Sequence, residues 1–235
     1  MKKKIRRISK MSKKVKHVVM IMICMVVLMF WQIPEVHAAS AAKTNKKAIS
    51  AYKKMLSNSY YSWTGQGDPE ANKTSNYSFC CVDINKDGVK ELIIHSEKAS
   101  WASNTYKLLV YRNGKVSSVL ACHGIEVYKK SRVIGVEEAH TGDFSGDFYT
   151  LSKKGKLKEK ASYCGTSYSG FFTYSNYKIK HTENGIFYFS YKIGGKETSY
   201  TNYQKKYSKL IKNNEGKVKL KFVKNTSANR MAKLK

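Results

Sequence analysis

The chain has 235 residues, and its 44 Lys and Arg residues outnumber its 16 Asp and Glu residues, which gives a formal net charge of +28. Such a charge attracts polyanions, but the basic residues are mostly lysines scattered over every segment, whereas specific readers of nucleic acid concentrate charge on one face and use Arg at base edges. The composition therefore argues against specific nucleic-acid recognition and favours diffuse attraction to an anionic wall polymer.

The first 38 residues have the pattern of a secretory signal peptide. A basic segment precedes an apolar run from Val18 to Trp31, and Val36-His37-Ala38 places small residues where a signal peptidase reads them. The run has about fourteen residues, fewer than the roughly 20 that span a bilayer, although a retained membrane anchor is the alternative. We expect cleavage after Ala38, so the protein would be secreted and would meet a membrane only before cleavage.

The remaining 197 residues (235 less 38) are enough for one domain with its own core. Loss of the signal peptide removes nine basic residues and Glu35, which leaves a formal charge of about +20. We expect a flexible lead-in over 39–45, a single secreted domain over 46–226, and a basic tail over 227–235 that frays or forms a short turn.

Apolar residues recur at helical spacing from Lys46 to Leu56, which predicts an amphipathic helix that ends near Asn58. A polar loop over 57–76 follows. Beyond it the chain is rich in aromatic and β-branched residues, and we expect strands over Tyr77–Asp83, Leu92–His95 and Tyr106–Tyr111. The 17 tyrosines suit half-buried strands as well as ligand stacking, and we expect the structural role.

Glycine-containing turns separate the β-rich stretches and predict hairpins, because glycine supplies the positive φ that tight turns require. They lie at Asn113-Gly114-Lys115, Lys154-Gly155-Lys156, Gly194-Gly195-Lys196 and Glu215-Gly216-Lys217. A second short helix is expected over Tyr203–Ile211, before a last hairpin arm at Val218–Val223. The pattern predicts an α+β fold in which an N-terminal amphipathic helix packs on a largely antiparallel β-meander, with a partial propeller or a curved sheet as variants.

Four cysteines remain once Cys24 leaves with the signal peptide, namely Cys80, Cys81, Cys122 and Cys164. An even number in an exported chain permits disulfides, and four cysteines allow three pairings. Cys80 and Cys81 are adjacent on an expected strand and therefore point to opposite faces. One disulfide and a set of small buried thiols are both compatible with the sequence.

The clearest motif is an acidic loop that starts at Asp83 and reads DINKDGVKEL. Oxygen-bearing side chains stand at alternate positions, Gly88 follows the third of them, and a carboxylate comes three residues later. Ca²⁺ takes six to eight oxygens at roughly 2.3–2.6 Å, which a tight loop of this kind can supply. The last carboxylate, Glu91, falls at position nine instead of the position twelve of an EF-hand, so the loop predicts a calcium site of another type.

This motif resembles the calcium loops of FG-GAP/VCBS-type repeats, in which acid-x-acid-x-acid-Gly-x-x-acid precedes an apolar residue, and the likeness covers about residues 79–96. A similar segment occurs in exported proteins of Gram-positive bacteria. The resemblance implies that calcium is bound by the side chains of Asp83, Asn85, Asp87 and Glu91 and by the backbone carbonyl of Val89. A polar β-turn, in which Asp and Asn cap their own backbone, is the alternative.

A second acidic stretch, Gly142–Asp147, has two carboxylates and a glycine but lacks a third acid at the needed spacing. We expect a plain turn there, with a degenerate site or a ligand lent to the first loop as alternatives.

The sequence as a whole favours a secreted, non-catalytic, calcium-binding domain that mediates binding or adhesion at the cell envelope. Its partner would be an unidentified protein, glycan or anionic wall polymer. The alternative is a secreted hydrolase of wall or host polymers. That enzyme would need a spatial carboxylate pair, such as Glu137 or Glu138 with Asp143, or a thiol nucleophile at Cys122 beside His123.

Overall fold

The computed structural model describes residues 33–61, 69–99, 105–140, 143–166, 178–182 and 185–235, together with Met20 and Met22. The chain divides into two compact units, Met1–Lys43 and Thr44–Lys235. Most of the expected signal peptide therefore lies outside the described residues. Within the described part of the chain, no helix is both long and apolar enough to cross a membrane.

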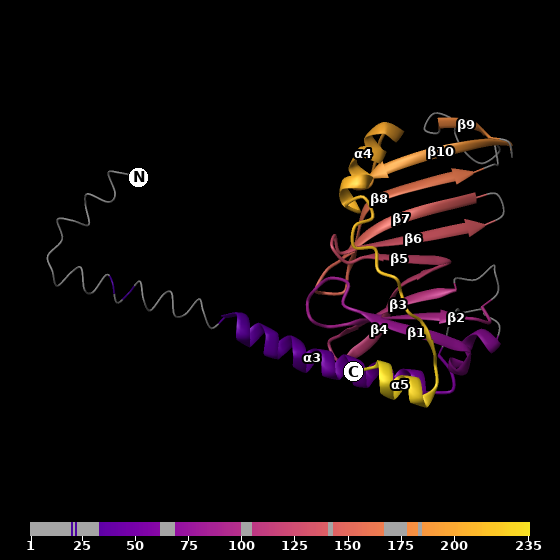
Figure 1. Cartoon of the computed structure of the whole chain (residues 1–235). Coiled ribbons are helices and arrows are strands. Elements are labelled where there is room, and N and C mark those ends of the chain that lie inside the picture. Colours follow the sequence, from indigo (N-terminus) through magenta and orange to yellow (C-terminus); the bar gives the residue numbers. More distant parts are fainter. Residues whose placement is uncertain are drawn as a thin grey trace, which may run out of the picture. The chain divides into compact units, whose positions relative to one another are not determined.

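The strands form two antiparallel sheets, which confirms a β-rich α+β class (Figure 1). The first sheet is five-stranded, in the order β12-β1-β2-β3-β4, and the second is seven-stranded, in the order β11-β10-β8-β7-β6-β5 with β9 on β10. Both sheets end in edge strands within the described residues, so neither closes into a barrel or a propeller. The first contains β1 (Tyr77–Val82), β2 (Glu91–Ser96), β3 (Tyr106–Arg112), β4 (Lys115–Cys122) and β12 (Val223–Lys224). The second contains β5 (Gly124–Tyr128), β6 (Val133–His140), β7 (Asp143–Leu151), β8 (Leu157–Thr166), β9 (Lys178–Thr182), β10 (Gly185–Ile193) and β11 (Lys196–Glu197).

Helix α3 (Ile33–Ser57) includes the predicted amphipathic helix but begins well before it. Residues 39–45, expected to form a flexible lead-in, are helical. The early start has a local cause, because residues 38–42 contain four alanines and alanine has the highest helix propensity. Two short 3₁₀ helices, η1 (Pro69–Asn72) and η2 (Thr74–Asn76), lie in the segment expected to be a polar loop.

The basic tail is not a frayed end. It forms helix α5 (Ser227–Lys233), whose N-cap Thr226 accepts a hydrogen bond from the amide of Asn229. Leu234 is fully buried in the same hydrophobic cluster as residues of α3. Just before α5, the amide nitrogen Nδ2 of Asn225 donates to the carbonyls of Leu56 (2.9 Å) and Thr74 (2.8 Å). The tail therefore belongs to the folded unit.

The tight turns confirm three of the four hairpin predictions. In the β3–β4 turn, Asn113 and Gly114 have φ of +52° and +79°, the two positive values of a type I′ hairpin. The fourth prediction is wrong: Gly216 follows helix α4 (Tyr200–Leu210), and of the expected arm at Val218–Val223 only Val223 lies in a strand. In the segment 217–222 apolar and polar residues alternate, as they do in a strand. Within the described residues, however, its only strand-like pairing is an isolated bridge between Lys217 and Tyr128.

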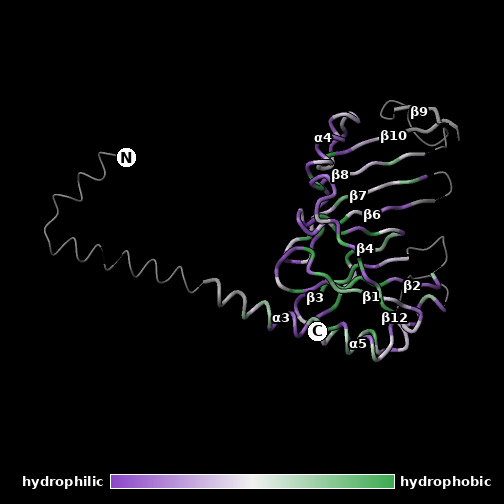
Figure 2. The backbone as a smooth tube through the Cα atoms, in the orientation of Figure 1, coloured by the Kyte–Doolittle hydropathy of each residue, from purple (hydrophilic) through white to green (hydrophobic). Residues whose placement is uncertain are grey.

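Buried apolar residues gather in three clusters. The first joins α3 to one face of the first sheet through Ala48, Tyr52, Leu56, Phe79 and Leu92. The second contains residues of both sheets, including Val82, Ile93, Leu108, Val127 and Ile134. The third lies on the other face of the second sheet, with Tyr128, Phe148 and Tyr203. Figure 2 shows hydrophobic stretches along the strands of the first sheet.

The four cysteines of the described chain are thiols and do not form disulfides with one another. Cys80 and Cys122 are buried in the second cluster, while Cys81 packs against the first, in keeping with alternation along β1. Burial raises the pKa of each of these three thiols to about 12. These three cysteines therefore act as small apolar residues, the second of the two possibilities left by the sequence.

Candidate functional site

The acidic loop, defined here as Asp83–Glu91, connects β1 to β2 and is anchored by two apolar side chains. Ile84 is fully buried and Val89 is 6% exposed. Gly88 has φ of +82°, a backbone conformation that favours glycine, and it allows the loop to turn sharply after Asp87. At the C-terminal end of the loop, the amide of Lys90 donates to Asn45 Oδ1 (2.9 Å), and the carbonyl of Lys90 accepts from the Tyr52 hydroxyl (3.1 Å). Both partners belong to α3, so the loop is tied to the helix.

Inside the loop, side-chain oxygens accept hydrogen bonds from backbone amides. Asp83 accepts from the amides of Asp87 (3.2 Å) and Gly88 (3.1 Å). Asn85 Oδ1 also accepts from the amide of Asp87 (3.0 Å), and Asp87 Oδ1 accepts from the amide of Val89 (2.9 Å). These contacts are the backbone caps of the β-turn alternative. They also shape the loop. Asp87 Oδ1 and the two Asp83 oxygens each accept one of these amides and keep a further lone pair for a cation.

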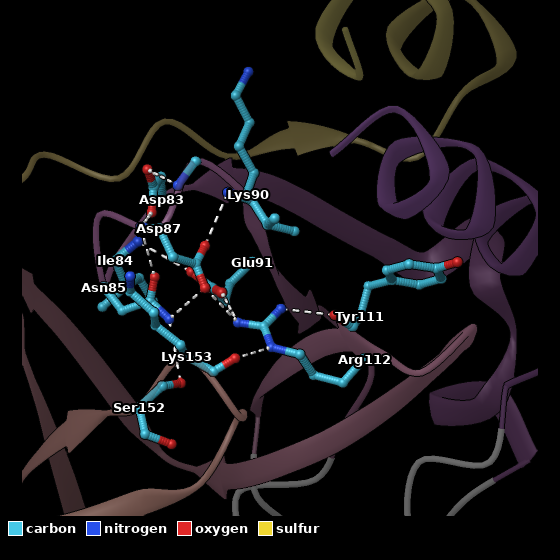
Figure 3. A network of polar contacts seen from close by, with 12 residues as sticks. Asp83, Ile84, Asn85, Asp87, Lys90, Glu91, Tyr111, Arg112, Ser152 and Lys153 are labelled. Carbon is cyan, nitrogen blue, oxygen red and sulfur yellow. Dashed lines mark hydrogen bonds and ion pairs between the residues drawn. The ribbon is translucent and has the colours of Figure 1, made fainter. Parts of the chain in front are cut away.

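A guanidinium lies where the acidic side chains converge (Figure 3). Arg112, at the end of β3, places Nη2 3.1 Å from Asp87 Oδ2 and 3.2 Å from Glu91 Oε1. The same guanidinium donates from Nε to the carbonyl of Lys153 (2.8 Å) and from Nη1 to the carbonyl of Tyr111 (2.7 Å). Asp87 and Glu91 are thus aimed at one positive charge, which links the loop to the β7–β8 turn.

Glu91 is the deepest member of the set, because its side chain is fully buried. Its second oxygen, Oε2, accepts from the amide of Ile84 at 3.0 Å. Burial raises the pKa of Glu91 to about 7, although the Ile84 amide and the Arg112 charge act in the opposite direction. A buried carboxylate of this kind is costly unless a cation compensates it.

Of the side chains that the sequence singled out, Asp83 and Asn85 share the amide of Asp87, and Asp87 and Glu91 share the guanidinium of Arg112. Val89 contributes its amide to Asp87 Oδ1. Three residues that the sequence did not indicate join them: Arg112, Lys153, and Ser152, whose carbonyl accepts from Asn85 Nδ2 at 3.3 Å. Across the described ranges, no group of three or more His, Cys, Asp and Glu side chains is arranged to hold a metal ion.

The second acidic stretch is not a turn. From Asp143 onward it is the first part of β7, paired with β6 and β8, while Gly142 lies outside the described residues. Two phenylalanines, at 144 and 148, alternate with small and polar residues at the period of a strand, a signal that the acidic residues obscured. Burial, and then the nearby charge of Glu159, raise the pKa of Asp147.

The structure disfavours the thiol nucleophile of the hydrolase alternative but leaves one of its two carboxylate pairs on a common face of the second sheet. Cys122 is fully buried with its pKa raised to about 12, the opposite of an activated thiolate. His123 instead pairs through Nδ1 with Glu138. Glu137 and Glu138 are consecutive in β6 and so lie on opposite faces of the sheet, with Asp143 on the face of Glu138.

Comparisons of this chain with protein-family models, with curated proteins and with solved structures found no match.

Proposed function

We propose that this protein is a secreted, non-catalytic binding domain that acts at the cell envelope and is stabilised by Ca²⁺ at the acidic loop. Its partner would be a protein, a glycan or an anionic wall polymer, the last favoured by the formal charge of about +20 that remains after loss of the signal peptide. The N-terminal segment would direct export and be removed after Ala38, and α3 would serve as the helix packed on the first sheet.

The observation that carries the proposal is the convergence of Asp87 and Glu91 on a single cation position. The oxygen donors are of the type that Ca²⁺ selects, and Asp83 and Asn85 flank them in the same loop. Arg112 supplies only one positive charge to two carboxylates. A divalent ion would balance both, with the carbonyl of Val89 and water as further ligands in the manner of an FG-GAP/VCBS-type loop.

The role of the ion would be structural. The acidic loop contacts α3 through Lys90 and the β7–β8 turn through Asn85 and Arg112. A cation bound there would hold together segments that are far apart in sequence. Sites of this extracellular kind bind calcium with Kd of about 10⁻⁴–10⁻³ M, so the ion would be bound outside the cell and lost inside it.

Calorimetric titration of the full chain with Ca²⁺, with thermal melts beside it, tests the proposal. We expect saturable binding with a raised melting temperature, lost in Asp87→Ala. The matched control is Asp143→Ala, which removes an exposed carboxylate from β7 and should leave binding unchanged. If millimolar calcium gives neither heat of binding nor a change in melting temperature, the loop is a capped β-turn held by Arg112 and not a calcium site.

The export part of the proposal has its own test. Expression in a Gram-positive host, followed by mass spectrometry of the protein recovered from the medium, should give a mature N-terminus at Ala39. Retention of the intact chain in the membrane fraction would contradict cleavage and favour an anchor.

A further inference from the structure

A cavity of about 510 Å³ opens on the second sheet, on the face that carries the third cluster. It lies between the sheet and α4, which Figure 1 shows beside β8 and β10. Its volume is in the range of small-molecule sites. The lining, called here the aromatic cavity, consists of Glu126, Gly135, Val136, Glu137, Phe148, Tyr163, Phe189, Tyr191, Tyr200, Thr201, Tyr203, Gln204 and Tyr207.

The floor of the aromatic cavity is built by pairing aromatic residues with glycines. Gly135 stands directly opposite Phe148 on the neighbouring strand, and Gly146 stands directly opposite Tyr163. A Cβ atom at position 135 would lie 2.9 Å from Phe148 Cε1, and one at position 146 would lie 2.2 Å from Tyr163 Cε1. The rings therefore occupy the space above the glycines. Both rings also belong to the lining of the cavity.

The wall is a tyrosine face of α4. Tyr200, Tyr203 and Tyr207 are spaced by three and four residues, which places them on one side of the helix. The Tyr203 and Tyr207 rings stack with centroids 5.5 Å apart, and Tyr191 of β10 lies 5.1 Å from both Tyr200 and Tyr203. Aromatic rings thus bound the cavity from the sheet and from the helix.

The hydrogen bonding of this wall is incomplete. Tyr203 is 3% exposed, and within the described part of the chain its hydroxyl has no hydrogen-bond partner. Buried polar groups without partners are rare and often mark the place of a water or a ligand.

The charges around the cavity have one sign. Among the described lining residues, two are glutamates and none is Lys, Arg or His, although the chain has 44 Lys and Arg against 16 Asp and Glu. Glu126 is paired with Lys217 from outside the lining, whereas Glu137 is exposed at the cavity. Ring faces are the negative ends of aromatic quadrupoles. The cavity therefore favours a cation and opposes the anionic polymers that the rest of the surface attracts.

We propose that the aromatic cavity binds a small organic cation, with a substituted ammonium group held against the tyrosine faces and balanced by Glu137. Recognition of quaternary ammonium groups by aromatic cages is the established use of cation–π attraction. The inference gives the proposed binding function a second site and a ligand class, and it is independent of the calcium loop in its residues.

The test uses two probes of the same shape. Choline carries the charge, and 3,3-dimethylbutan-1-ol is its neutral carbon isostere. Titration of the full chain, followed by tyrosine fluorescence and calorimetry, should show choline binding about tenfold more tightly than the isostere, the ratio expected for a cation–π contact in a partly desolvated site. Equal binding of the two probes, or no choline binding at all, would overturn the proposal.

Variants then locate the site. Tyr191→Leu should weaken choline binding about tenfold, and Glu137→Gln, an exposed change that leaves the fold intact, should weaken it several-fold. The matched control is Glu159→Gln in β8, a glutamate outside the lining, which should bind choline like the unchanged protein. If Glu137→Gln and Glu159→Gln behave alike, or if a neutral sugar binds better than choline, the cavity is not a cation site.

Calcium titration of the same samples separates this inference from the proposed function. Choline binding without calcium binding would overturn only the loop, and calcium binding without choline binding would overturn only the cavity.

Discussion

The acidic loop takes its candidate ligands from nine consecutive residues, Asp83–Glu91, whereas the aromatic cavity takes its lining from six elements between Glu126 and Tyr207. In the loop, two carboxylates contact the guanidinium of Arg112, and the side chain of Glu91 is fully buried. The cavity is open, wide and mostly aromatic. On the two proposals made above, the loop would serve stability by holding an ion, and the cavity would serve binding by holding an exchangeable ligand.

The two regions also differ in what maintains their structure. In the loop, two carboxylates depend on Arg112 or on a bound ion for compensation. In the cavity, shape depends on two glycines that leave room for rings. Changes of charge in the loop should therefore act on stability, whereas changes of volume in the cavity, or of the charge of Glu137, should act on ligand binding.

The largest effect is expected from Arg112→Ala in the presence of a chelator. It would leave Glu91 and Asp87 without a cation, and removal of one partner of a buried pair costs about 3–5 kcal/mol. The free energy of unfolding, measured with urea, should fall by about that amount and recover when calcium is added. Lys115→Ala, an exposed change in the same hairpin, should have little effect. Full stability of Arg112→Ala in chelator would show that the loop needs no cation.

Gly146→Ala should act on the cavity alone. The added Cβ would meet the Tyr163 ring and force it to move, at a cost of about 1–3 kcal/mol typical of overpacking. Choline binding should be lost while calcium binding remains. Ser145→Ala, at the neighbouring position whose side chain points to the other face, is the control. Unchanged choline binding in Gly146→Ala would mean that the Tyr163 ring does not shape the site.

The acidic loop could be recognised in the sequence because its oxygen-bearing residues are close neighbours along the chain. Alternating oxygens and Gly88 singled out Asp83, Asn85, Asp87 and Glu91, and their role as calcium ligands stays a prediction. Arg112 was not identifiable, because it lies 21 residues beyond Glu91 and reaches the loop only through the pairing of β2 with β3. A pattern of neighbours predicts a loop, but it does not show which distant residue completes it.

The aromatic cavity was not predicted, for the same physical reason. Tyrosines at strand period look alike whether they fill a core or line a site, and the sequence was interpreted in favour of the core. The deciding facts are the cross-strand pairs Gly135–Phe148 and Gly146–Tyr163, which depend on register. The fold class and three of the four glycine turns followed from local chemistry. The strand identity of 143–151 was missed because Asp143 and Gly146 were interpreted as turn residues.

Tyr203→Phe should change the free energy of unfolding less than Arg112→Ala or Gly146→Ala, and it should raise it where they lower it. Its hydroxyl is buried without a partner among the described residues, so its removal should raise the free energy of unfolding, by up to about 1 kcal/mol. Tyr128→Phe is the matched control, since the Tyr128 hydroxyl donates to Glu126 and its loss should cost about 1 kcal/mol. Thermal melts of both variants measure the difference, and a destabilised Tyr203→Phe would show that this hydroxyl has a partner in solution.

Two glutamates whose pKa values move in opposite directions should make the stability depend on pH. Burial alone would raise the pKa of Glu126, but hydrogen bonds from Lys217 and Tyr128 outweigh it and lower the value. The folded state then binds this proton less readily than the unfolded state. Its contribution to stability is present above the ordinary carboxyl pKa and is lost as the pH falls through the lowered one. Since Glu126 is partly exposed, the loss should stay below about 1 kcal/mol.

Glu91 should show the reverse dependence when calcium is chelated. Its pKa is raised to about 7, so between the ordinary carboxyl pKa and pH 7 the folded state holds a proton that the unfolded state has released. Stability should therefore decline as the pH rises through this window, and bound calcium should remove the decline by favouring the ionised form. Urea unfolding across the acidic range, with Glu126→Gln, Glu91→Gln and the exposed Glu197→Gln as control, separates the two contributions. If Glu91→Gln leaves the free energy of unfolding near pH 7 unchanged, Glu91 is already ionised and paired with Arg112. The loop would then need no bound cation besides Arg112.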